Sequence, residues 1–126
     1  MRPYNLYLFV FLLIAGANGH AQSTDIDSLK LLLEVHDDDT IKVNTLNQIA
    51  SIIFRSDPDE AIRYSEDALL LADQINFRKG QALAYKNQGL GYYMQGQYAD
   101  AFRSWEPSLL IYEELGDFKM VANLLS

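Results

Sequence analysis

Residues 36–39, a histidine followed by three aspartates, are the first place in this sequence where side chains could bind a metal ion. A calcium-binding loop of the EF-hand type that began at Asp37 would need glycine where Lys42 stands and glutamate where Gln48 stands. Because neither requirement is met, we expect no metal site. We expect instead a solvated loop in which Asp39 caps the helix that follows it.

Patterns for nucleophilic catalysis and nucleotide binding are also incomplete. His36 is the one histidine after residue 21, and no positioned nucleophile accompanies it, so a Ser-His-Asp triad is not expected. Gly89 and Gly91 form a short glycine motif, but Met94 stands where a dinucleotide fingerprint would have its third glycine, and no strand precedes the motif. The carboxylates form no pair that would flank a scissile bond. We therefore expect no catalytic residue, no cofactor and no enzymatic activity within these residues.

The N-terminus has the pattern of an export signal. Arg2 supplies a positive charge, residues 6–15 are apolar apart from Tyr7, and small residues at Gly19 and Ala21 surround a cleavage point. The apolar run is well short of the roughly 20 residues that a membrane-spanning helix needs. We predict that residues 1–21 are a signal peptide cleaved after Ala21, that the protein is exported to the periplasm, and that the mature segment has no membrane span. An uncleaved N-terminal anchor is the alternative.

The mature part of the chain is small and acidic. Removing residues 1–21 of 126 leaves 105 residues, enough for one modest domain. Only one of the 10 Lys and Arg is lost and none of the 17 Asp and Glu, so the formal net charge becomes −8. Such a surface repels nucleic acids and anionic lipids, and we expect neither as a partner. The absence of cysteine excludes disulfide bonds and thiolate metal sites.

Apolar residues recur at helical spacing through the mature chain, and no run alternates long enough for a strand. The fold class is therefore all-α. The spacing predicts about six helices: residues 26–35, 41–55, 58–75, 78–95, 98–115, and a last one that begins at about residue 117.

Several helix ends carry local signals. Asp57 is a helix cap, Pro58 suits the first helical position, and Glu60 stands where a capping box would return a hydrogen bond to the cap backbone. Asn76 and Gly116, forty residues apart, are both residues that adopt the left-handed conformation that closes a helix.

The forty-residue interval recurs at other positions and indicates an internal repeat. The matching pairs are Ala61 and Ala101, Ala68 and Ser108, Leu69 and Leu109, and Leu71 and Ile111. Repeats of this length are typical of stacked helical units, which cannot bury their apolar faces alone and usually provide a binding surface.

One unit resembles the tetratricopeptide repeat (TPR) in its order of aromatic and small residues. The matching residues are Tyr85-x-x-Gln88-Gly89-x-x-Tyr92 and then Gly96-x-Tyr98-x-x-Ala101-x-x-x-Trp105. The resemblance implies antiparallel helical hairpins stacked as a right-handed solenoid. It divides the chain into an N-terminal helix with an acidic loop (22–38), repeat 1 (39–76), repeat 2 (77–116) and the truncated first helix of repeat 3 (117–126).

The chain departs from the family pattern in two respects. Its spacing is forty residues instead of the usual thirty-four, and Pro107 falls inside a helix, where it costs about 3 kcal/mol unless the helix kinks. We expect a kink that an outer helix tolerates, with a functional bend as the alternative.

The resemblance also implies a concave groove, lined by the first helix of each hairpin, that binds a protein or peptide. The corresponding residues are Asn44, Asn47, Ser51, Phe54, Arg55, Leu83, Lys86, Asn87, Leu90 and Tyr93. A clamp for a C-terminal carboxylate is not expected, because the family would have asparagine where Leu90 stands. The alternatives are solvated surface for Lys86 and Asn87, and packing between hairpins for Phe54 and Tyr93.

An export signal followed by such repeats resembles the N-terminal periplasmic region of Bacteroidetes-type sensor and signalling proteins. This likeness implies a non-catalytic interaction module that acts as the input part of a larger protein in signal transduction. We expect the chain to be a fragment, because Val121, Leu124 and Leu125 lack a partner helix in the sequence. The alternative is the N-terminal fragment of an enzyme, a histidine kinase or nucleotide cyclase, whose catalytic domain lies elsewhere.

Overall fold

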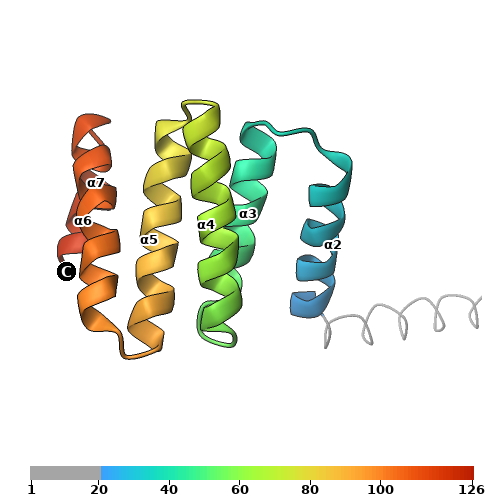
Figure 1. The fold of residues 1–126 in the computed structure, drawn as a ribbon, viewed down its shortest axis with the longest axis horizontal. Helices are drawn as coiled ribbons and strands as arrows, with labels where there is room; N and C mark the ends of the chain where they lie inside the picture. Colours follow the sequence, from blue (N-terminus) through green and yellow to red (C-terminus); the bar gives the residue numbers. More distant parts are fainter. Residues whose placement is uncertain (1–20) are drawn as a thin grey trace, which may run out of the picture.

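The computed structural model describes residues 21–126, and every regular element in that range is a helix (Figure 1). The helices are α2 (Ala21–Val35), α3 (Thr40–Ile53), α4 (Pro58–Gln74), α5 (Arg78–Met94), α6 (Tyr98–Glu114) and α7 (Phe118–Leu125). The all-α prediction is confirmed for these residues. Residues 1–20, which hold nearly all of the predicted signal peptide, lie outside the described part of the chain.

The predicted helix bounds agree with the observed ones to within two residues, except at α2. This helix begins at Ala21, five residues before the predicted start at Ile26. The residues between them are polar and give no apolar periodicity, but they include no proline or glycine that would stop a helix.

Helices α4, α5, α6 and α7 begin at regular intervals. Their first residues are Pro58, Arg78, Tyr98 and Phe118, twenty residues apart, and α4, α5 and α6 each have 17 residues. The forty-residue interval of the sequence thus corresponds to one pair of helices.

The ends of α4, α5 and α6 share one turn geometry. Asn76, Gly96 and Gly116 have positive φ angles of 55°, 75° and 69°. In each turn the next residue donates its backbone N–H to a carbonyl five residues before it, as from Phe77 to Ala72 at 2.8 Å. This is the Schellman motif, and it confirms the left-handed conformation predicted for Asn76 and Gly116.

Aspartate side chains begin three of the helices. Asp39, Asp57 and Asp117 each accept a backbone N–H three residues later, at 3.1, 3.1 and 3.2 Å. The caps predicted for Asp39 and Asp57 are confirmed. The capping box is wrong, however, because the Glu60 carboxylate pairs with Arg63 and the Asp57 backbone N–H donates to the Ile53 carbonyl at 2.7 Å.

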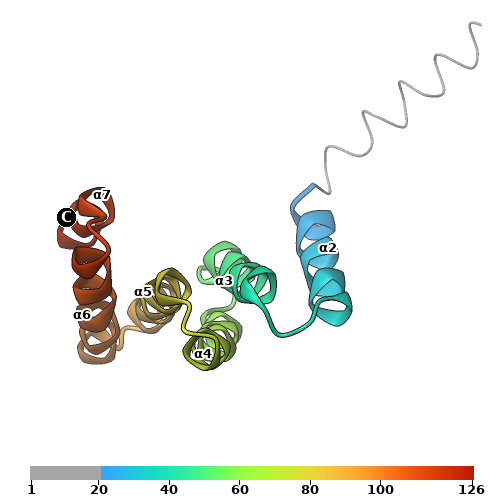
Figure 2. The same cartoon turned by 90° about the horizontal axis from the view of Figure 1, so that it is seen from above.

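The helices follow one another in a row from α2 to α7, with α4 on one side of α3 and α5 (Figure 2). Small residues lie where they approach most closely. The alanines with no exposed surface are Ala50, Ala61, Ala68, Ala72, Ala82, Ala84 and Ala101. At the N-terminal end, Leu29 of α2 packs against Ile49 and Ile53 of α3. Helix α6 continues through Pro107, which lies inside it.

Candidate partner-binding groove

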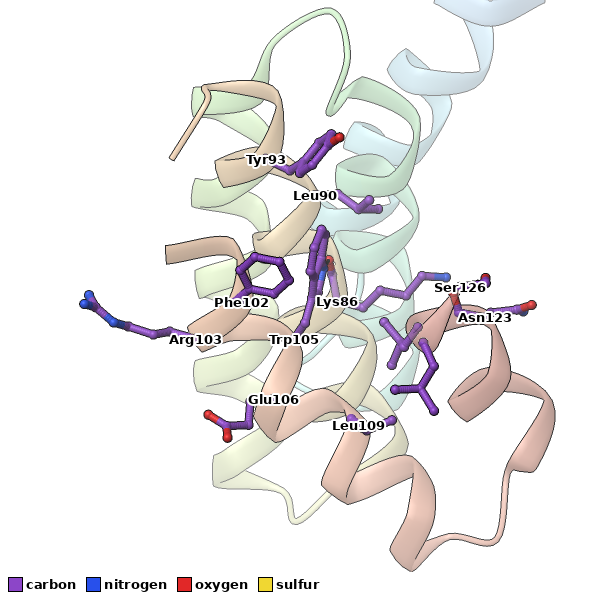
Figure 3. Close-up of a pocket in the computed structure, with 12 residues that line it drawn as sticks. Lys86, Leu90, Tyr93, Phe102, Arg103, Trp105, Glu106, Leu109, Asn123 and Ser126 are labelled. Carbon is purple, nitrogen blue, oxygen red and sulfur yellow. Dashed lines mark hydrogen bonds between the residues drawn. The ribbon is translucent and has the colours of Figure 1, made fainter. Parts of the chain in front are cut away.

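A groove of about 810 Å³ lies between α5, α6 and α7 (Figure 3). Its lining combines aromatic and aliphatic side chains with a few charged ones. The lining residues are Lys86, Leu90, Tyr93, Phe102, Arg103, Trp105, Glu106, Leu109, Asn123, Leu124, Leu125 and Ser126.

Aromatic rings form one wall of the groove. The Tyr93 and Trp105 ring centroids are 5.9 Å apart, and Phe102 meets Trp105 edge-on at 5.8 Å. Tyr98 extends the group, with its ring centroid 5.2 Å from that of Tyr93. These separations favour mutual aromatic attraction, yet Tyr93, Tyr98 and Phe102 all remain exposed. We call Tyr93, Tyr98, Phe102 and Trp105 the aromatic cluster.

Two local features hold Trp105 in place. Its indole Nε1 donates a hydrogen bond of 3.1 Å to the Lys86 carbonyl. Its ring lies against Gly89, where a Cβ atom would be 2.2 Å from Nε1. Glycine is therefore required at position 89 for α5 and α6 to approach with the indole between them.

Charged groups stand at the rim of the groove. Lys86 is half-buried, and Arg103 and Glu106 are exposed. The Arg103 guanidinium pairs with Asp100 of its own helix at 3.1 Å, an exposed pair that contributes little to stability. The rim therefore provides charges of both signs around an apolar floor.

The buried tyrosine Tyr112 lies in α6, in a cluster with Ala82 and Ile111 against which Met120 and Val121 of α7 pack. Burial, and then the charge of Asp117, raise the pKa of Tyr112 to about 12. Its hydroxyl has no hydrogen-bond partner among the described residues. The Tyr112 side chain belongs to the cluster against which α7 packs, and it does not line the groove.

Three of the ten residues predicted for the groove, Lys86, Leu90 and Tyr93, line it. Two others, Asn47 and Asn87, are 3% exposed and join α3 to α5. The Asn87 amide donates to the backbone carbonyl of Asn47 at 3.0 Å and to its side-chain oxygen at 3.3 Å. The Asn47 amide in turn donates to the Gly80 carbonyl at 3.1 Å. These two amides are thus engaged in helix packing.

The other five predicted residues lie away from the groove. Asn44, Ser51 and Arg55 are exposed. Phe54 packs against the cluster that holds Leu29 and Ile49, with the Arg55 guanidinium 5.0 Å from its ring centroid. Leu83 packs against the cluster around Ile111 and Tyr112.

The sequence interpretation did not include the groove residues of α6, namely Phe102, Arg103, Trp105, Glu106 and Leu109. The resemblance assigned binding to the first helix of each hairpin only. An available signal was the aromatic spacing, because Tyr98, Phe102 and Trp105 fall on one face of a helix.

The arrangement can bind an apolar chain segment and orient it by rim charges. Within residues 21–126, no group of three or more His, Cys, Asp or Glu side chains could hold a metal ion. No helix in this described range is long and apolar enough to cross a membrane. Comparisons of the chain with protein-family models, with curated proteins and with solved structures find no match.

Proposed function

We propose that this chain is a non-catalytic module for protein–protein interaction, and that its groove binds a segment of a partner protein. The observation that carries the proposal is the aromatic cluster. Large aromatic side chains that stay exposed beside a groove are the residues most enriched in the energetically important centres of protein interfaces. Phe102, in particular, is 66% exposed although it lies beside Trp105.

The scaffold behind the groove is, in this proposal, a TPR-like right-handed solenoid of stacked hairpins. The equal spacing of helix starts from α4 onwards and the three identical Schellman turns support a repeated unit. The hydrogen bonds between Asn47 and Asn87 support the stacking, because they join equivalent positions of successive hairpins.

The module is further proposed to be exported and to form the sensing part of a larger signalling protein. This part of the proposal is supported by the pattern of residues 1–21 and by the resemblance to periplasmic repeat regions. We expect mass spectrometry of the periplasmic fraction to detect a mature chain that begins at Gln22. An uncut chain retained in the cytoplasm would contradict export.

Site-specific photocrosslinking tests the binding role. A benzoylphenylalanine residue replaces either Tyr93 in the groove or Leu70, an exposed residue of α4 that does not line it. Both chains are expressed with their own N-terminus in the cells that normally make the protein, and adducts are identified by mass spectrometry. We expect a discrete adduct from position 93, its loss when Phe102 is replaced by serine, and none from position 70. Equal adducts at both positions, or none at position 93, would exclude the groove.

A further inference from the structure

We draw no further inference here: the strongest candidate, the apolar face of α2 on which Leu31, Leu32 and Val35 are exposed, carries none because nothing in the structure shows what covers it.

Discussion

The helix pair α3 and α4 and the helix pair α5 and α6 have equivalent surfaces, forty residues apart in sequence, but within residues 21–126 only the first is closely covered. Ile62 of the first hairpin lies under α5, whereas the equivalent Phe102 of the second is mostly exposed. Trp105 of α6 is likewise the residue forty positions after Ser65 of α4. The difference teaches that two positions forty residues apart can be core in one helix pair and exposed in the next, depending on which helix packs over them.

The strongest test of this comparison is a matched pair of truncations. Ile62→Ala should lower the free energy of unfolding by about 2–4 kcal/mol, because it leaves a cavity under Gly91. Phe102→Ala should change it by less than about 1 kcal/mol, because the ring loses little buried surface. Urea denaturation of both variants checks this. Similar losses for the two would mean that Phe102 is part of the core in solution.

Tyr112 allows a second test, because the equivalent residue of the first hairpin is Ala72. Since the pKa of Tyr112 is about 12 in the folded chain and the ordinary value is 10.0, folding favours the neutral phenol. This stabilisation is present below pH 10 and is lost as the pH rises towards 12. Over that range the wild-type chain should lose up to about 2–3 kcal/mol more than Tyr112→Phe.

The control for this prediction is the same pair near pH 8. There Tyr112→Phe should be neutral or more stable by up to about 1 kcal/mol, because the buried hydroxyl has no partner among the described residues. Urea denaturation at each pH measures the difference in the free energy of unfolding between the two chains. The ionisation of the other tyrosines affects both chains equally and does not contribute to this difference. Parallel stability curves up to pH 12 would show that Tyr112 is exposed in solution.

The amide contact between the hairpins is the third test. Asn87→Ala removes the donor that reaches Asn47 and leaves the buried side-chain oxygen of Asn47 without it, so it should cost about 2 kcal/mol. Asn44→Ala, on the exposed side of α3, should stay within about 0.5 kcal/mol of the wild type. Thermal unfolding measures both. Equal effects would argue against the stacking of α3 on α5.

Much of the scaffold was predictable because its causes are local. Asp39 and Asp57 cap helices by hydrogen bonds that span three residues, and Asn76 closes a helix by its own φ angle. The return bond of Glu60 was not predictable in the same way, because Arg63 competes for its carboxylate. A capping pattern states which bond can form, not which competitor is nearby.

The groove was less predictable because it depends on contacts between distant residues. The resemblance assigned both Asn87 and Tyr93 of α5 to the groove, but Asn87 is buried against Asn47 and Tyr93 is half exposed beside Trp105. A periodic pattern shows which side of a helix is apolar. It does not show which neighbouring helix covers that side, or where along the helix the cover ends.

The smallest expected effect comes from the three Schellman turns, in which Asn76 follows α4 and a glycine follows each of the next two helices. A non-glycine residue at positive φ carries a steric cost, which asparagine reduces but does not remove. Asn76→Gly should therefore stabilise the chain by up to about 1 kcal/mol, and the reverse exchange Gly116→Asn should destabilise it by a similar amount. A Cβ atom at Gly116 would meet no atom within 4 Å, so the reverse exchange reports the backbone alone. Opposite shifts of similar size in urea denaturation would show that the turns are equivalent, whereas shifts of the same sign would mean that the first repeat ends by a different mechanism from the second.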